Sequence, residues 1–203
     1  MAGEQMANEK WQIALEAITE RLTSLDEAGC EAEAIQLGQQ GAAGLSLLAE
    51  LLVHHETDVR FWAVRGLWAN GSAAAVKLLT EALQDPEEMV RSGAAMALGE
   101  LKAEIAMASL AKVLTADPSA CGNHAADALA KIGEAAAPAL VEAMGHEQSW
   151  VRVRAAKALI PVQSKAAIPA LFAALEDDSY VVRQYAEEAL ARLGVGQMVY
   201  FTP

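Results

Sequence analysis

Paired aliphatic positions recur along the chain at a fixed distance. Six times an aliphatic residue is followed, fifteen positions later, by a leucine, and successive pairs are offset by 30 or 31 residues. A period of this size indicates one supersecondary unit copied in tandem, because a single unit cannot bury its own apolar face. The pairs are Leu22/Leu37, Leu52/Leu67, Leu83/Leu98, Leu114/Leu129, Met144/Leu159 and Leu175/Leu190.

Each unit contains two amphipathic helical patterns. In the first, apolar residues lie on one helical stripe, as do Val76, Leu79 and Leu83. The second is an Ala-rich run that ends at the marker leucine, and a short break with helix-start residues, such as Asp85-Pro86, precedes it. We therefore predict an all-α fold, a right-handed α-solenoid (superhelix) of about six helical hairpins. The marker residues expected to be buried between layers include Leu52, Leu67, Leu83, Leu98, Leu114 and Leu129.

The repeats resemble a known family. The clearest second-helix copy, residues 90–99, reads Val-Arg-Ser-Gly-Ala-Ala-Met-Ala-Leu-Gly. This pattern, in units of about 31 residues, is similar to the short HEAT-like repeats of the phycobilisome-lyase (PBS lyase) type. The copy at 103–133 departs from it, with Cys121-Gly122 in place of Val-Arg. The resemblance implies an armadillo-like helical solenoid whose second helices line the concave surface.

The repeats organise residues 1–203 as one solenoid domain. Residues 8–41 match poorly and are predicted to form a degenerate N-terminal capping repeat, because solenoid ends need a polar outer face. Residues 43–194 form five repeats. The apolar tail, residues 195–203, is predicted to fold back as a C-terminal cap or to act as a short docking segment.

Charge and composition limit the possible partners. The formal net charge is −12 and the pI is about 4.7, which argues against binding to the phosphates of nucleic acid. No signal peptide and no transmembrane helix are expected, so no membrane partner is predicted. Cys30 and Cys121 lie three repeats apart and are expected to be free thiols. Together these features favour a cytoplasmic monomer.

An arginine recurs at the start of four second helices, next to loop acids such as Asp58, Glu88 and Asp178. These arginines are either a row that binds an anionic ligand or a ladder that holds loop carboxylates and carbonyl oxygens. We favour the ladder, because recurrence in every copy is typical of a scaffold. The four residues are Arg60, Arg91, Arg152 and Arg183.

The variable positions of the second helices predict a binding surface instead. Positions two and five residues after the repeat arginine share a helix face and form two rows along the stack. Trp, Tyr, Arg and Met, which are enriched at interfaces, occur there. The predicted partner-binding residues, which include Trp150 just before the fourth arginine, are Trp62, Arg65, Gly93, Met96, His124, Asp127, Trp150, Arg154, Lys157 and Tyr185.

Candidate chemistry is weaker. Cys121 and His124 could suggest a nucleophile or a metal site, but two ligands do not make a zinc site, and Cys121 occupies a buried Val position. The His-Glu pairs at 54–56 and 146–147 fall in loops, whereas iron-binding HEAT-like proteins carry such pairs on second helices. We therefore predict no catalytic residues, no metal and no cofactor.

Two functions remain as hypotheses. The first is a non-catalytic scaffold or adaptor that binds a protein, acidic if Arg154 and its neighbours are the anchors, through the concave face. The alternative, implied by the resemblance, is a bilin-lyase subunit or phycobilisome-turnover factor that handles a linear tetrapyrrole (bilin) on a phycobiliprotein.

Overall fold

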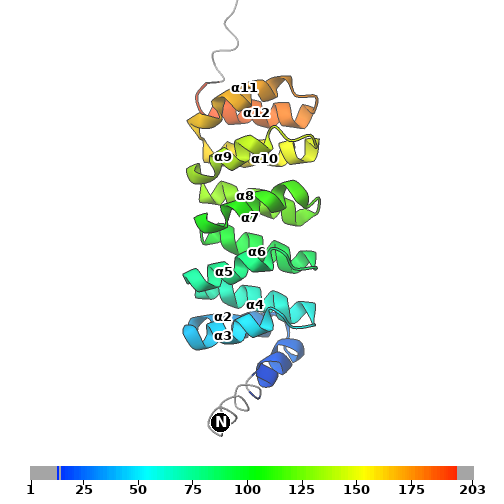
Figure 1. Cartoon of the computed structure of the whole chain (residues 1–203), viewed down its shortest axis with the longest axis vertical. Helices are drawn as coiled ribbons and strands as arrows, with labels where there is room; N and C mark the ends of the chain where they lie inside the picture. Colours follow the sequence, from blue (N-terminus) through cyan, green and yellow to red (C-terminus); the bar gives the residue numbers. More distant parts are fainter. Residues whose placement is uncertain (1–12, 14, 196–203) are drawn as a thin grey trace, which may run out of the picture. The chain divides into compact units, whose positions relative to one another are not determined.

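The structure, a computed structural model, describes residues 13 and 15–195, so most of the predicted C-terminal tail and the start of the predicted capping repeat lie outside the described residues. Throughout the described part the chain is all-α, without strands, as predicted (Figure 1). Residues 15–24 are helical and are followed by α2. The further helices are α2 (Glu27–Gln39), α3 (Ala42–Leu51), α4 (Thr57–Asn70), α5 (Ala73–Ala82), α6 (Glu88–Glu100), α7 (Met107–Ala116), α8 (Ala120–Ile132), α9 (Ala137–Ala143), α10 (Ser149–Val162), α11 (Ile168–Ala173) and α12 (Tyr180–Arg192).

The helices alternate as predicted between first and second members of hairpins. Three first helices, α7, α9 and α11, are entered through a short 3-10 turn, and α11 also ends in one. The chain divides into two compact units, Met1–Ala97 and Leu98–Pro203, with the boundary inside α6. In the first unit α2 packs directly on α4, and α3 packs against both of them. In the second unit α10 packs on both α8 and α12. Neighbouring hairpins within each unit are thus stacked through their second helices.

The marker leucines form the core of each unit. Leu67 and Leu83 in the first unit, and Leu98, Leu114 and Leu129 in the second, are at most 1% exposed. Full burial of a leucine side chain contributes about 1.5–3 kcal/mol relative to exposure, so these positions explain why the period is kept. The prediction is confirmed for these five residues.

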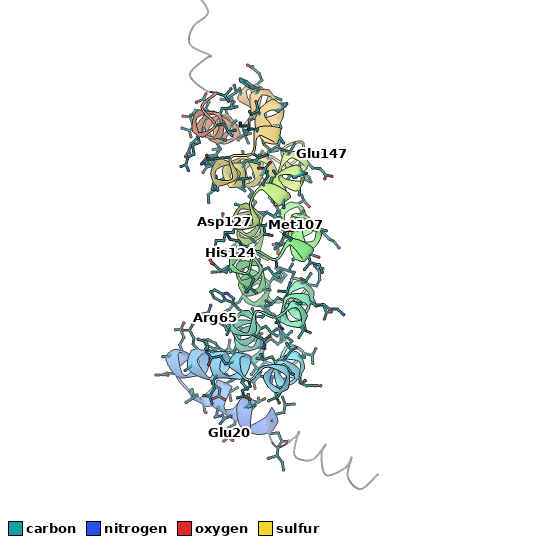
Figure 2. The ribbon with its side chains drawn as sticks, turned by 90° about the vertical axis from the view of Figure 1, so that its left-hand side faces the viewer. Glu20, Arg65, Met107, His124, Asp127 and Glu147 are labelled. Atoms are coloured by element: carbon teal, nitrogen blue, oxygen red, sulfur yellow. The ribbon has the colours of Figure 1, made fainter. Side chains whose placement is uncertain are left out.

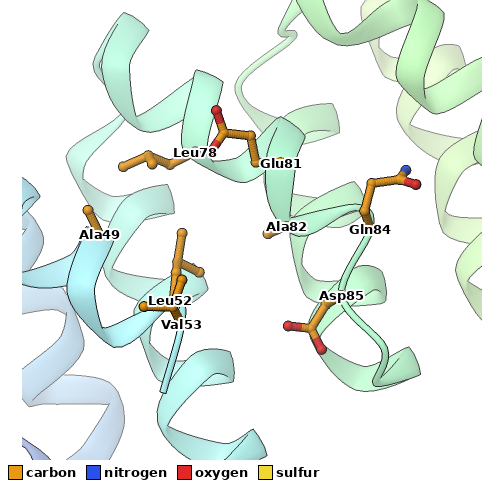
Figure 3. Close-up of a pocket in the computed structure, with 8 residues that line it drawn as sticks. All are labelled: Ala49, Leu52, Val53, Leu78, Glu81, Ala82, Gln84 and Asp85. Atoms are coloured by element: carbon orange, nitrogen blue, oxygen red, sulfur yellow. The ribbon is translucent and has the colours of Figure 1, made fainter. Parts of the chain in front are cut away.

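Leu52 is an exception, and its predicted burial is wrong. Leu52 is only half-buried, whereas Leu51 is fully buried. The reason is local: α3 carries a large side chain at Leu51, where α5 has Ala82, so Leu51 fills the core. Leu52 instead lines a notch of about 220 Å³ with Val53 and Leu78 (Figure 3).

Two of the repeated arginines clamp a loop of the following repeat. The guanidinium of Arg60 donates to both carboxylate oxygens of Asp85 (2.8 and 3.0 Å). Arg152 does the same to Asp177 (2.7 and 2.9 Å). Each also donates to carbonyl oxygens of the loop before its own helix, His54 and His146 among them. The carboxylate partner of Arg60 is therefore Asp85 rather than Asp58, and the ladder is confirmed.

The loop aspartates serve a second purpose. Asp85 accepts a hydrogen bond from the backbone N–H of Glu87, and Asp177 accepts one from that of Ser179 (2.9 and 2.8 Å). Such Asx turns shape the entry into the second helix. One carboxylate therefore fixes the turn of its own repeat and binds the arginine of the preceding repeat. Arg91 and Arg183 donate to loop carbonyl oxygens in the same way.

The clamp changes the ionisation of its members. The hydrogen bond from Arg152, reinforced by the N–H of Ser179, lowers the pKa of Asp177 from 3.8 to about 2. The hydrogen bond to Asp177 correspondingly raises the pKa of Arg152. Because the folded pKa of Asp177 is depressed, its contribution to stability is fully present above its unfolded pKa and is lost as pH falls through the folded value.

We therefore predict that Asp177→Asn lowers the free energy of unfolding at pH 7, and that this difference from wild type disappears between about pH 4 and about pH 2. Urea unfolding followed by circular dichroism at a series of pH values measures it. The control Asp178→Asn removes a neighbouring carboxylate that is 85% exposed and should cost less at pH 7. A wild-type advantage over Asp177→Asn that persists at pH 2 would contradict the clamp.

Candidate protein-binding face

The predicted rows lie on the side of the second helices that faces away from the first helices. In the second unit, His124 and Asp127 lie on α8, on the opposite side of the hairpin from Met107 of α7 (Figure 2). In the first unit, Arg65 lies on α4 (Figure 2). We use the name second-helix face for this side in each unit. Most predicted residues are exposed or half-buried there, with Arg154 as the exception.

The first unit concentrates aromatic side chains on this face. Trp62 is half-buried and stands edge-to-face with Phe61, with ring centroids 5.2 Å apart. The guanidinium of Arg65 lies 4.6 Å from the ring centroid of Trp68 and forms an ion pair with Glu31 of α2. Partly exposed aromatic groups at helical spacing provide large contact area at low entropic cost, as binding hot spots require.

Two neighbours on α6 complete this surface. Met96 is 44% exposed. A Cβ added to Gly93 would lie 3.4 Å from the ring of Phe61, so the glycine lies directly beside this ring. We define the α4 aromatic face as Phe61, Trp62, Arg65, Trp68, Gly93 and Met96.

Phe61 and Trp68 are absent from the residues predicted by sequence. The signal was present, because Phe61, Arg65 and Trp68 have the i, i+4, i+7 spacing of a single helix face. The prediction considered only the positions two and five residues after the repeat arginine. Phe61 and Trp68 lie one and eight residues after it and were therefore missed.

Arg154 is not the exposed anchor that the sequence predicts. It is only 8% exposed, and its guanidinium lies 4.6 Å from the ring centroid of Trp150. Burial lowers its pKa, although Asp117 opposes this shift. The guanidinium donates to Asn123 Oδ1 (2.7 Å) and to the carbonyl oxygens of Leu114 (3.4 Å), Asp117 (2.7 Å), Pro118 (3.1 Å) and Ser119 (2.7 Å).

This arginine also explains the break in the repeat pattern at Gly122. A Cβ at position 122 would lie 2.2 Å from Nη1 of Arg154 and 2.3 Å from the backbone carbonyl oxygen of Asp117 that this nitrogen bonds, so only glycine fits beside their hydrogen bond. The substitution of the usual Arg by glycine on α8 and the extra arginine on α10 are therefore two halves of one contact. Arg154 satisfies the carbonyl oxygens of the α7–α8 turn and is a structural residue.

The other predicted residues of the second unit are mixed in character. Asp127 and Lys157 are exposed, and Tyr185 and His124 are half-buried. Within the described part of the chain, Nδ1 of His124 is buried and has no hydrogen-bond partner. This portion of the face is polar and lacks the aromatic density of α4.

The cysteines behave as small hydrophobic groups. Cys121 is fully buried, and neither it nor Cys30 forms a disulfide. The thiol of Cys30 donates to the carbonyl oxygen of Leu22 (3.2 Å), and burial raises its pKa. Among residues 13 and 15–195, no three or more His, Cys, Asp or Glu side chains gather as a metal site would require. The pairs at 54–56 and 146–147 lie in loops before α4 and α10, as predicted.

The repeat architecture identifies the family. The chain belongs to the HEAT repeat family, since the family model for HEAT repeats matches residues 45–121 and 123–191. The sequence matches none of the curated proteins with which it was compared. Among the helices of the described residues, none combines the length and apolar character needed to cross a membrane.

Several solved structures share the fold. The HEAT-like repeats protein from the archaeon Thermococcus onnurineus NA1 has a TM-score of 0.59 at 16% identity, covering 88% of this chain and 80% of that one. The complex of CpcE and CpcF of phycocyanin lyase from Nostoc sp. PCC7120 has a TM-score of 0.51 at 24% identity, covering 89% and 77%. A designed armadillo repeat protein in complex with the peptide (KR)4 has a TM-score of 0.53 at 21% identity, covering 88% and 99%. At these identities the likeness shows the fold alone.

We predict that Arg154→Lys destabilises the protein by about 2–3 kcal/mol, because one ammonium group cannot replace a guanidinium that donates to several carbonyl oxygens around the α7–α8 turn. Urea unfolding measures the change. The matched control Lys157→Met, on the exposed side of the same helix, should change stability by no more than about 0.5 kcal/mol. If Arg154→Lys were as stable as wild type, the structural role of Arg154 would be contradicted, and Arg154 would again be a candidate binding residue.

Proposed function

We propose that this HEAT repeat protein is a non-catalytic scaffold or adaptor that binds a protein partner through its second-helix face. The observation that carries this proposal is the α4 aromatic face, where Phe61, Trp62 and Trp68 are all partly exposed on one helix. Such clusters are uncommon on surfaces without a binding role, because exposed apolar groups promote aggregation. Tryptophan and arginine are also the residues most enriched at hot spots.

The fold supports this type of interaction. The designed armadillo repeat protein was solved with a bound peptide, and CpcE was solved in a complex with CpcF. Solenoids of stacked hairpins offer an extended surface whose recurring residues hold the stack while variable ones contact the partner. In this chain, the variable positions at α4 and α6 are the ones with interface character.

The predicted acidity of the partner loses its main support. Arg154, the proposed anchor for a partner carboxylate, is buried and already bonded. Arg65 is engaged by Glu31. Of the basic residues in the predicted rows, Lys157 alone remains exposed. We therefore retain the protein-binding role and do not build it on an acidic partner.

A second candidate function is the handling of a linear tetrapyrrole as part of a bilin lyase. The likeness to the phycocyanin lyase complex favours it, at the level of the fold. Mixing the protein with a free bilin and recording the visible spectrum distinguishes the two candidates. A shifted and intensified absorption band supports tetrapyrrole handling, and an unchanged spectrum leaves the scaffold role.

The scaffold role predicts that Trp62→Ala weakens binding of the natural partner by about 2 kcal/mol or more, roughly 30-fold. The partner is captured from an extract of the native cell, identified by mass spectrometry and titrated calorimetrically against the purified protein. The matched control is Phe172→Ala, which removes an aromatic ring that is 39% exposed on the first helix α11. If Trp62→Ala binds normally, or if only Phe172→Ala fails to bind, the second-helix face is not the binding surface.

A further inference from the structure

The chain uses the same contact twice in its own structure, an arginine stacked on a tryptophan. Arg65 covers Trp68 in the first unit, and Arg154 covers Trp150 in the second, each with the guanidinium carbon 4.6 Å from the ring centroid. Trp62 is the third tryptophan among the described residues, and there its ring has no cation over it. It lies about one helical turn from Arg65, on the α4 aromatic face.

The charged side chains that α2 and the first turn of α4 bring to the α4 aromatic face are mainly acidic. On α2, Glu31 keeps 42% of its side chain exposed while it pairs with Arg65, and Glu27 lies one turn earlier on the same face. On α4, Asp58 is exposed in the first turn. Residues 1–97 carry 15 acidic and 6 basic side chains in all. A ligand that approaches Trp62 therefore enters a negative field.

The basic residues of this unit are already committed. Arg60 is buried against Asp85, and Arg21 pairs with Glu33. Arg91 donates to the carbonyl oxygens of Asp85 and Pro86. Among the described residues of the first unit this leaves Lys77, which lies on the first helix α5 rather than on the second-helix face. Within the described part of the first unit, every arginine is therefore already engaged elsewhere, and the one lysine lies on a first helix.

Resting on the protein-binding role proposed above, we infer that the α4 aromatic face receives a basic segment of the partner, with an arginine stacked on Trp62 and paired with the acids of α2 and α4. A planar guanidinium suits this site because it stacks on an indole face and bonds to carboxylates at its edge. The internal stack of Arg65 on Trp68, with Glu31 at its edge, provides the same three-part arrangement one turn away. The partner thus repeats on Trp62 a contact that the protein makes within itself.

The test uses the full chain and a short synthetic peptide in which arginine and alanine alternate, labelled for fluorescence anisotropy. A peptide of equal length with glutamate in place of arginine is the reference. We expect the arginine peptide to bind, with an affinity that falls as salt rises, and the glutamate peptide not to bind. Trp62→Ala should weaken binding of the arginine peptide by about 5–30-fold.

Two variants that each remove one negative charge distinguish a local contact with the arginine peptide from a general attraction between the acidic protein and the basic peptide. Glu31→Gln should weaken binding of the arginine peptide about threefold or more, because it removes the carboxylate that pairs with Arg65 at the edge of the α4 aromatic face. Glu81→Gln removes the same charge from α5, where the residue lines the notch on the first helices, and should leave the affinity unchanged because screening limits charge effects to about 8 Å. Circular dichroism and urea unfolding confirm that each variant is folded.

The outcomes are distinguishable. Equal binding of the two peptides, or binding of the arginine peptide that Trp62→Ala and Glu31→Gln leave intact, overturns the inference. If neither peptide binds while Trp62→Ala still abolishes binding of the natural partner, the basic segment is wrong and the scaffold role stands. If the natural partner binds Trp62→Ala normally, the proposed function itself fails at this face.

Discussion

A helical hairpin of about 30 residues cannot bury its apolar stripe by itself, and this constraint governs the molecule. The marker leucines reach full burial because each hairpin packs on the next within its unit. Small residues allow the close approach: a Cβ at Gly99 would lie 2.7 Å from the Cα of Ala128. Without a neighbour, each hairpin would expose its leucines, so stability belongs to the stack and not to the single repeat.

Polar contacts fix how the hairpins meet. Arg60 and Arg152 each reach a loop aspartate of the following repeat, which in turn shapes the start of the next second helix. A buried ion pair adds less net stability than its geometry suggests, because both charges are desolvated. The hydrogen bonds of the ion pair are directional, however, whereas the apolar contacts of the leucines are not. We therefore assign the register of stacking to the arginine clamps and most of the free energy to the leucines.

The sequence predicts the recurring features well and the variable ones less well. The period and the hairpins follow from patterns that recur along the chain, and the ladder follows from an arginine that four copies repeat. Arg152 and Arg154 show where this reasoning ends. They lie two residues apart on α10, but Arg154 fits a space that exists only because Gly122 stands on a different helix. Gly122 and Arg154 each depart from the repeat pattern in a different copy, so no periodic signal in the sequence connects them and only the structure shows their contact. Leu52 fails for a similar reason, since the burial of Leu51 beside it depends on a local change of side-chain size.

This division between recurring and variable positions supports the proposed protein-binding role. Residues common to the repeats hold the stack together, and the α4 aromatic face is left to bind the partner. The most direct test of the division is a double-mutant cycle between Arg60 and Asp85, with Arg60→Met and Asp85→Asn measured singly and together by urea unfolding. A structural clamp predicts a coupling free energy of about 1–3 kcal/mol. A coupling below about 0.5 kcal/mol would contradict the account and would make the recurring arginines available as a binding row.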